Sequence, residues 1–312
     1  MNEEKEPIVS IWCTTFNQKK YIRECLNGFI LQQTNFKFEV IVHDDASTDG
    51  TDLIVREYEK KYPHLFRNIY QTENQFKKQN TLVYILSKTS KSKYIALCEG
   101  DDYWTDPYKL QMQVDFLESN EEYSFSFHQG LKINENDSSY EVYPLTNIKS
   151  FDAESFFKMP TIPVASIVFR RRVPLNVLKN HSHGDFLILC SLLSHGKAWF
   201  INEVMSVYRV HPSGVSYTHS SLPYVKKRLD ELYIESNVSE FSEEVQKQIA
   251  RIYMEHTIFM LTNYKKEIPR AERLGYLFRF MKLKKPGMNH WPYYKKLLGQ
   301  ILSSLVITLF IQ

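Results

Sequence analysis

Strand and helix signals alternate along the first hundred residues, and this alternation limits the possible folds more than any other pattern in the chain. Short, nearly unbroken apolar runs lie at 8–14, 38–43 and 94–98, and stretches with helical spacing lie between them at 20–32 and 52–62. Apolar strands separated by amphipathic helices indicate a mostly parallel central sheet with helices on both faces. The predicted fold class is therefore α/β.

Each of these three strands is followed by polar residues. The first runs into "CTTFN", the second into "HDDASTDGT" and the third into "EGDDYW". In open α/β sheets, ligands bind outside the carboxyl ends of the strands. The three polar segments are therefore expected to meet at one edge and to form the functional site.

Composition excludes several other classes of protein. The chain has 312 residues, 43% apolar and 24% charged, with a net charge of +3, which is ordinary globular composition and no sign of a nucleic-acid partner. Its four cysteines have no C-x-x-C spacing, so they are expected to be reduced core thiols of a cytoplasmic protein. The N-terminus lacks a signal-peptide core, and no apolar run reaches the ~20 residues of a membrane span.

The acidic pair Asp44-Asp45 comes directly after the second strand. The residues that follow have a simple structural explanation, because Ser47 or Thr48 could cap the next helix and Asp49 would favour its positive end. That explanation does not cover the pair itself. A carboxylate at this position can accept hydrogen bonds from a nucleobase or ribose, so a nucleotide contact is predicted.

Three carboxylates lie within four positions at Glu99, Asp101 and Asp102. The simplest interpretation is a solvated acidic loop. Acids crowded at the end of a buried strand repel one another, however, and a bound cation would offset that repulsion. Hard divalent ions take oxygen ligands and often use only one or two carboxylates, leaving room for substrate phosphate.

Three later residues are candidates with a structural alternative. Asp185 enters a very apolar segment, where it could cap a helix or, with a raised pKa, serve as a general base. His211 in "YRVHPSGVS" could be a loop histidine or a metal ligand, and Arg170 in "FRRRV" could be solvated or contact phosphate or acceptor.

With these residues in place, the chain resembles family 2 glycosyltransferases with the GT-A fold, of the type that builds bacterial surface polysaccharides. The resemblance covers about 7–217 and rests on "VSIWCTTFNQKKYIRECLNGFILQQ", "FEVIVHDDASTDGT", "YIALCEGDDYWTDPYKLQMQVDFLE" and "GDFLILCSLLSHGKAWFINEVMSVYRVHPSGVS". It implies an inverting transferase that moves one sugar from a nucleotide-diphosphate sugar to an acceptor hydroxyl. The signature of processive synthases is absent.

The resemblance also assigns roles to individual residues. The expected donor contacts are Thr14, Phe16, Asp45, Lys77 and Asp101. Asp102 would coordinate a divalent metal, Mn²⁺ or Mg²⁺, with His211 completing its shell, and Asp185 would be the general base. Trp104 and Arg170 would contact the acceptor or the sugar.

Two other functions remain open from the sequence. A nucleotidyltransferase would also need a nucleotide and a divalent ion, but the glycine-rich loop usual after its first strand is missing from "CTTFNQKK". A non-catalytic nucleotide-binding protein would have no need for acids at all three functional positions.

The predicted domains are a GT-A catalytic domain at 1–221 and a helical, basic C-terminal region at 222–312. Between Lys265 and Lys296 there are ten Lys or Arg residues and two acids, interleaved with aromatic residues. This region is either a helical subdomain with a basic solvated face or, through 265–312, an attachment to an anionic membrane surface. Attachment to the inner face of the cytoplasmic membrane would suit a glycan acceptor carried on a lipid.

Overall fold

The computed structural model describes residues 6–76, 91–159, 161–171, 184–214, 221–264, 266–283 and 285–297 of the chain. The chain divides into two compact units, Met1–Gly214 (unit 1) and Val215–Gln312 (unit 2). The boundary predicted after residue 221 lies within the second of them.

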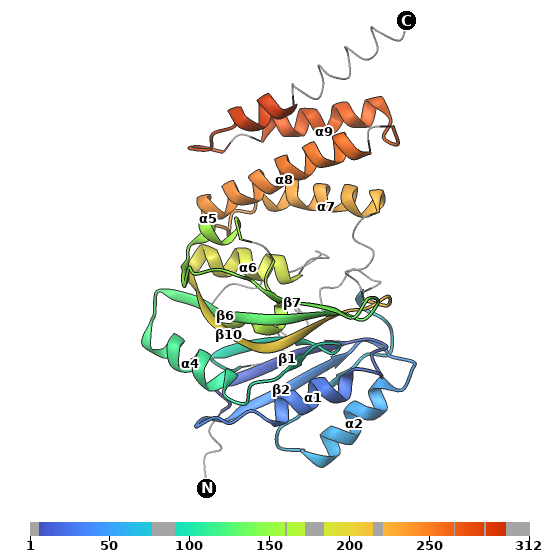
Figure 1. The fold of residues 1–312 in the computed structure, drawn as a ribbon, viewed down its shortest axis with the longest axis vertical. Coiled ribbons are helices and arrows are strands. Elements are labelled where there is room, and N and C mark those ends of the chain that lie inside the picture. The colour runs from blue at the N-terminus through green and yellow to red at the C-terminus, as the bar shows by residue number, and fades with distance from the viewer. Residues whose placement is uncertain are drawn as a thin grey trace, which may run out of the picture. The chain divides into compact units, whose positions relative to one another are not determined.

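Unit 1 is built on one mixed sheet (Figure 1). In the part of the chain that the structure describes, its strands are β1 (Val9–Thr15), β2 (Phe38–Asp44), β3 (Ile69–Tyr70), β4 (Tyr94–Glu99), β5 (Tyr103–Trp104), β6 (Tyr123–Asn134), β7 (Ser139–Tyr143), β8 (Ser150–Phe151), β9 (Val168–Arg170) and β10 (Lys197–Val210). They lie in the order β3-β2-β1-β4-β9-β6-β10-β5, with β7 paired to β6 and β8 to β10.

The direction of the strands changes along this sheet. β1 to β4 are mutually parallel, as predicted for the first hundred residues, and β6 is parallel to β10. β9 joins the two groups and is antiparallel to both of its neighbours, and β5, β7 and β8 also pair antiparallel. The parallel half therefore presents the carboxyl ends of β1, β2 and β4 at one edge.

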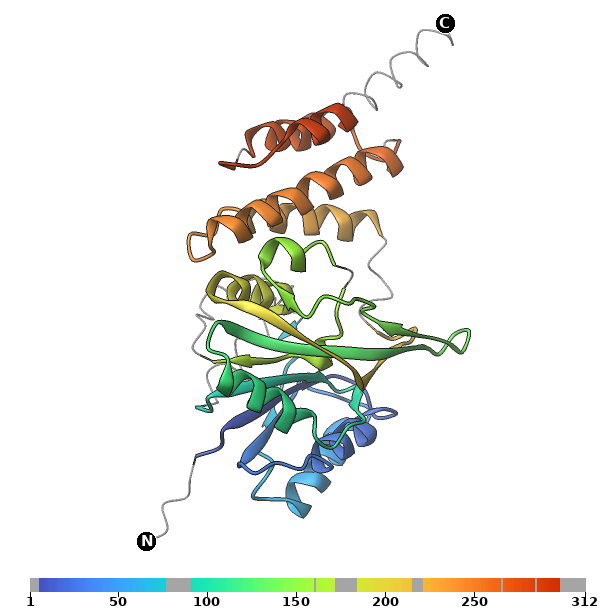
Figure 2. The ribbon, with the colours of Figure 1, turned by 60° about the vertical axis from the view of Figure 1, so that its left-hand side comes forward.

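Helices cover both faces of this sheet. They are α1 (Ile22–Ile30), α2 (Thr51–Lys61), α4 (Lys109–Ser119), the short α5 (Ala153–Phe156), α6 (Gly184–His195) and a 3-10 turn, η2 (Val164–Ser166). Figures 1 and 2 show α1 and α2 on one side of the sheet and α6 on the other. The fold class is α/β, as predicted.

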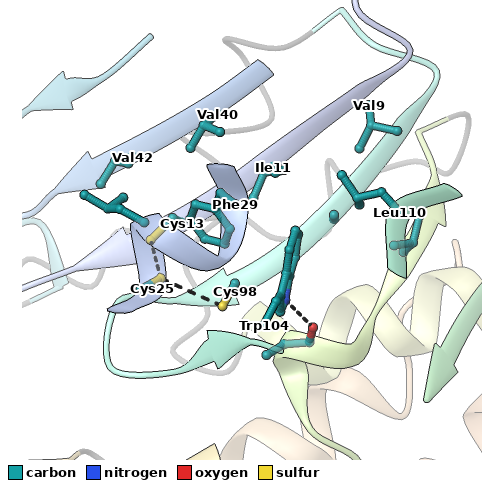
Figure 3. Packing of buried hydrophobic residues seen from close by; sticks show 14 of the residues in the cluster. Val9, Ile11, Cys13, Cys25, Phe29, Val40, Val42, Cys98, Trp104 and Leu110 are labelled. Atoms are coloured by element: carbon teal, nitrogen blue, oxygen red, sulfur yellow. Dashed lines mark hydrogen bonds between the residues drawn. The ribbon is translucent and has the colours of Figure 1, made fainter. Parts of the chain in front are cut away.

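A hydrophobic core lies between the parallel strands and helices α1, α2 and α4, and part of it is drawn in Figure 3. Phe29 of α1 packs edge-on against Trp104, with ring centroids 4.9 Å apart, and both side chains are buried. Burying a large apolar side chain contributes about 1.5–3 kcal/mol. All four cysteines are buried and free, as expected for core thiols, and Cys25 Sγ lies 3.9 Å from Cys13 Sγ and 4.0 Å from Cys98 Sγ.

One local prediction is wrong. The N-cap of α2 is Gly50, at φ +92°, and neither Ser47 nor Thr48 caps the helix. Ser47 Oγ instead accepts the backbone N–H of Asn17, which ties the loop after β2 to the loop after β1. α6 ends at His195, and at Gly196 a Cβ would meet the carbonyl oxygen of Glu122 at 2.8 Å, so glycine lets the chain pass close to β6.

Unit 2 is helical in its described part, with α7 (Leu222–Glu235), α8 (Glu243–Asn263) and α9 (Arg270–Lys282). Apolar side chains including Leu232, Ile249 and Phe280 form its interior. Arg228 pairs with the buried Glu235 at 3.0 Å. Among the described helices of the whole chain, none combines the length and apolar character that crossing a membrane requires.

Candidate active site

The polar segments that follow β1, β2 and β4 meet at one edge of the sheet, as the sequence predicted. The backbone N–H of Gly100 donates to Thr14 O at 2.9 Å, and that of Asp45 donates to Thr15 O at 2.9 Å. Thr14 also lies opposite Glu99 in the register of β1 and β4. The end of β1 is therefore the centre of the site, with one acidic segment on each side.

Three carboxylates form a compact cluster at the end of β4. One oxygen each from Glu99, Asp101 and Asp102 lies within 4.8 Å of the others. Gly100 allows this close packing, because a Cβ there would lie 2.5 Å from Gln18 Oε1 and 2.8 Å from Thr15 Oγ1. We call Glu99, Asp101 and Asp102 the acidic cluster.

Burial and mutual repulsion weaken the acidity of this cluster. Burial, followed by the charges of Asp101 and Glu99, raises the pKa of Asp102 well above its usual range. The Glu99 side chain still reaches solvent, yet the protein around its carboxylate, together with Asp101 and Asp185, raises its pKa to about 8. Asp102 Oδ2 is buried and has no hydrogen-bond partner among the described residues. An orphaned carboxylate oxygen beside two further acids fits a divalent cation with oxygen ligands.

Arg209, at the end of β10, holds the acidic cluster from one side. Its backbone N–H donates to Asp102 Oδ1 at 3.0 Å, and its guanidinium donates to the carbonyl oxygen of Asp101 at 2.5 Å. The guanidinium also pairs with Glu24 of α1 and lies 4.3 Å from the centre of the Tyr103 ring. One arginine therefore connects β10, α1 and the loop that carries the acids.

His211 lies beside Asp101. Its Nε2 is 3.1 Å from Asp101 Oδ2, its Nδ1 is 2.8 Å from Ser213 Oγ, and its ring lies against that of Tyr21 at 4.6 Å. The structure thus brings His211 to the acidic cluster from over one hundred positions away. The hydrogen bond goes to Asp101, whereas Asp102 was expected to share a metal with His211.

Asp44 and Asp45 lie at the end of β2 and are both buried. Asp45 accepts the backbone N–H groups of Gln75 at 2.7 Å and Phe76 at 3.1 Å, one on each carboxylate oxygen. Asp44 accepts the N–H of Ser47 at 3.1 Å, and burial raises its pKa. Asp45 therefore holds the segment after β3 in place. A nucleotide that contacted Asp45 would have to bind the carboxylate lone pairs that these two N–H groups leave free.

Of the other predicted donor contacts, two lie at the end of β1 and one lies outside the described residues. Thr14 is half-buried at the edge of the sheet, and Phe16 is exposed just beyond β1. Lys77 lies outside the described residues.

Asp185 is the second residue of α6 and is exposed. It lies within the first turn, so it is not the helix cap that the sequence offered as the structural alternative. Its charge contributes to the raised pKa of Glu99, so it lies within electrostatic reach of the acidic cluster. Because Asp185 is exposed, it lacks the apolar surroundings on which the sequence-based prediction of a general base rested. Its position near the cluster remains.

Trp104 and Arg170 do not lie where a sugar or acceptor could touch them. Trp104 is 2% exposed and donates its indole N–H to Ala165 O at 2.8 Å. Arg170 pairs in register with Tyr94, at the start of β4 and so at the opposite edge of the sheet from the acidic cluster. Its guanidinium is buried and donates to backbone carbonyls, including Tyr123 O at 2.8 Å. Both side chains stabilise the fold, and the expected sugar contact is wrong for them.

Sequence reasoning missed two residues of this region. Arg209 stands two positions before His211, and a lone arginine ending a strand beside a candidate ligand was its only signal. Tyr143 lies in a stretch without motifs, and the negative charges of Asp102 and Glu99 contribute to the rise of its pKa. Only the pairing of β7 with β6 brings it near the acidic cluster.

Comparison with known proteins finds one matching family and several relatives. The model of the family described as glycosyl transferase family 2 matches residues 10–173. An uncharacterized protein of Mycobacterium tuberculosis is 38% identical over 213 residues, which cover 66% of this chain and 60% of that protein. The chain thus spans about 60% of the length of this relative.

Two further matches have described functions or solved structures. The Escherichia coli protein WfaP, named UDP-Glc:alpha-D-GlcNAc-diphosphoundecaprenol beta-1,3-glucosyltransferase, is 28% identical over 218 residues, covering 67% of this chain and 80% of WfaP. The structure of S. aureus TarS 1–349 in complex with UDP-GlcNAc matches with a TM-score of 0.63 at 16% identity, covering 88% of this chain and 81% of TarS 1–349. At that identity the likeness shows the fold, which is GT-A.

Proposed function

Because this chain belongs to glycosyl transferase family 2, we propose that it transfers one sugar from a nucleotide-diphosphate sugar to a hydroxyl of a glycan acceptor, with inversion at the anomeric carbon. The observation that carries the proposal is the meeting of the polar segments after β1, β2 and β4 at one edge of a GT-A sheet, with Asp185 of α6 within electrostatic reach of the acidic cluster. Asp45, the acidic cluster and Asp185 come from far apart in the sequence, and each has a place in such a transfer. The names of WfaP and TarS support a uridine nucleotide as the first donor to test.

The acidic cluster would hold a divalent cation, Mn²⁺ or Mg²⁺. When bound, the cation would neutralise charge on the diphosphate leaving group. Asp101 and Asp102 supply carboxylate oxygens, and His211 reaches the cluster through its contact with Asp101. Asp45 and Thr14 would contact the nucleoside at the neighbouring strand ends.

Asp185 is the proposed general base. It would accept the proton of the acceptor hydroxyl while the hydroxyl oxygen attacks the anomeric carbon and the nucleoside diphosphate leaves from the opposite side. One carboxylate base facing a separate leaving-group site fits a single displacement better than the paired carboxylates of glycosidases. Asp185 and the acidic cluster come from different elements, which allows the two roles to be separate.

A donor panel tests the function. Transfer and hydrolysis are measured with UDP-glucose, UDP-N-acetylglucosamine and a guanosine-diphosphate sugar, with and without Mn²⁺. We expect one donor to be turned over only in the presence of metal. If no donor binds and metal changes nothing, the proposal fails.

Asp185→Asn tests the base. We expect it to retain donor binding and to lose transfer by about 10²-fold or more, the usual range for removing a general base. Asp115→Asn, an exposed acid on α4, is the matched control. Equal loss of binding and transfer would show that Asp185 supports the fold and does not act as the base.

We further propose that the acceptor is lipid-linked and that unit 2 contacts the anionic inner face of the cytoplasmic membrane. Leu274, Phe278 and Met281 are 57%, 54% and 50% exposed and share one face of α9, and Lys282 Nζ lies 4.3 Å from the Phe278 ring. Exposed apolar side chains beside basic ones suit the interface of an anionic bilayer.

Flotation with vesicles containing phosphatidylglycerol tests this contact. Replacing these three α9 residues by serine should abolish flotation, whereas Phe259→Ser, a change at an equally exposed position of α8, should not. Undiminished flotation of the triple variant would contradict the proposed contact.

A further inference from the structure

Tyr143 is the last residue of β7, and the sheet carries it toward the acidic cluster. It pairs with Gly130 of β6, Gly130 pairs with Ser206 of β10, and Ser206 pairs with Trp104 of β5. Trp104 stands two positions after Asp102. A row of paired residues across four strands thus connects Tyr143 with the loop that holds the acids.

A second tyrosine lies beside Tyr143 at this place. The ring centroids of Tyr143 and Tyr208 are 6.3 Å apart with the planes at 63°. Tyr208 precedes Arg209, whose backbone N–H is bonded to Asp102 Oδ1 at 3.0 Å. Both tyrosines are half-buried, so part of each residue still reaches solvent. We call Tyr143 and Tyr208 the tyrosine pair.

The phenol of Tyr143 remains a hydrogen-bond donor. Burial, followed by the charge of Asp102 and smaller contributions that include Glu99, raises its pKa above the usual range, so the hydroxyl keeps its proton. Among the described residues, this hydroxyl has no hydrogen-bond partner. A neutral O–H within electrostatic reach of carboxylates, next to aromatic residues that are not fully buried, is a combination that binds polar ligands with apolar faces.

We propose that the tyrosine pair is a sugar-binding subsite of the transferase, an inference that rests on the proposed function. The C–H bonds on one face of a pyranose ring carry a small positive charge and pack against the negative face of an aromatic ring. The Tyr143 hydroxyl would donate to a hydroxyl or ring oxygen of the same sugar. The sugar belongs either to the donor or to the acceptor, and the chemistry of recognition is the same for both.

Two variants of Tyr143 and one control test the subsite. Tyr143→Leu removes the ring and the hydroxyl, and Tyr143→Phe removes only the hydroxyl. Tyr140→Leu makes the same change on the same strand at a position that is 75% exposed. Calorimetry gives the dissociation constants of UDP-glucose, UDP-N-acetylglucosamine and UDP, and kinetics give KM for the acceptor.

We expect Tyr143→Leu to weaken the binding of one sugar by about tenfold or more, which corresponds to about 1.4 kcal/mol. If the variant binds the sugar nucleotide more weakly while the dissociation constant of UDP is unchanged, the subsite belongs to the donor sugar. If the dissociation constants of the donors are unchanged and the KM for the acceptor is raised, the subsite belongs to the acceptor. Tyr143→Phe should show a smaller shift in the same ligand, and Tyr140→Leu should show none.

The subsite is overturned if wild type binds sugar nucleotides and Tyr143→Leu matches Tyr140→Leu for every ligand. If Tyr143→Leu does not fold, Tyr143→Phe decides, and wild-type constants for that variant overturn the proposal. A wild-type protein that binds no sugar nucleotide refutes the proposed function itself, and the subsite with it. The two failures are therefore distinguishable.

Discussion

Single residues decide how the acidic cluster is held. The carboxylates repel one another, and Arg209 supplies the positive charge and the two hydrogen bonds that keep their loop in place. The guanidinium touches the backbone of Asp101 and not its carboxylate, so Arg209 is a positioning residue. Its fork of donors allows it to hold the Asp101 carbonyl and Glu24 together, which a lysine ammonium does less well.

Arg209→Gln should therefore weaken Mn²⁺ binding by about tenfold, a loss of the size expected for a hydrogen-bonded charge. Electron paramagnetic resonance of free Mn²⁺ measures binding without any substrate. Arg209→Lys should restore part of the affinity, and Arg23→Gln, which breaks an exposed pair with Glu57, should leave it unchanged. Wild-type Mn²⁺ affinity in Arg209→Gln would contradict the positioning role.

Lys109 is a buried cation whose effect on stability depends on pH. Its Nζ donates to Gln113 Oε1 at 2.8 Å and lies 4.1 Å from the Trp104 ring, and burial lowers its pKa from 10.5 to about 7. Between these two pKa values the unfolded state holds more protons than the folded state. The free energy of unfolding of the wild type therefore rises with pH across that window.

Lys109→Met removes this titration while keeping an unbranched side chain. The free energy of unfolding of the variant should exceed that of the wild type most at pH 6, and this difference should shrink by about 2 kcal/mol by pH 9. Urea unfolding of both proteins at the two pH values measures the difference, and other titrating groups cancel in the comparison. A pH-independent difference would show that Lys109 keeps an ordinary pKa in the folded state.

At the scale of elements, the close contact of α1 with β5 sets the position of the loop that carries the acids. A Cβ on Gly28 would lie 2.8 Å from the carbonyl oxygen and 2.9 Å from the amide nitrogen of Trp104. Both are backbone atoms, so neither can rotate away. The contact therefore requires glycine and fixes β5 directly after Asp102.

Gly28→Ala should lower the free energy of unfolding by about 2 kcal/mol, within the range for overpacked cores. Gly275→Ala on α9 is the control, because nothing lies within 4 Å of its Cβ position. Alanine has the better helix propensity there and should stabilise by up to about 1 kcal/mol. If thermal unfolding shows the two alanine variants to be equally stable, α1 does not pack on β5 as described.

At the scale of the whole molecule, the described site residues belong to unit 1 and the proposed membrane contact belongs to unit 2. A chain ending at Gly214 should therefore keep the sugar-nucleotide affinity of the full chain within about twofold, a difference below ~0.5 kcal/mol. The same chain should no longer float with anionic vesicles. Far-ultraviolet circular dichroism checks that the shortened chain is folded. Loss of donor binding by a folded chain would mean that unit 2 contributes to the site.

Local patterns in the sequence were sufficient to predict the parallel strands and the edge at which their polar residues meet. Apolar runs followed by acids are local patterns. Because parallel strands present ligands at their carboxyl ends, these patterns predicted that Thr14, Asp45 and the acidic cluster would be neighbours. The family resemblance added Asp185 and His211, and both lie near the cluster. The meeting of the strand ends is confirmed, because it depended on short segments and on the direction of each strand, whereas the roles of the individual side chains stay predictions.

Which candidates face solvent, and which partners they contact, depends on packing between elements that are distant in the sequence. Trp104 and Arg170 are residue types that are common in binding sites, but the strands that carry them, β5 and β9, pair antiparallel with their neighbours. The Trp104 side chain therefore points into the core, and Arg170 lies at the opposite edge of the sheet from the acidic cluster. Arg209 and Tyr143 reach the acids only through the pairing of β10, β6 and β7. Long-range strand pairing leaves no local pattern in the sequence, which is why these contacts could not be predicted.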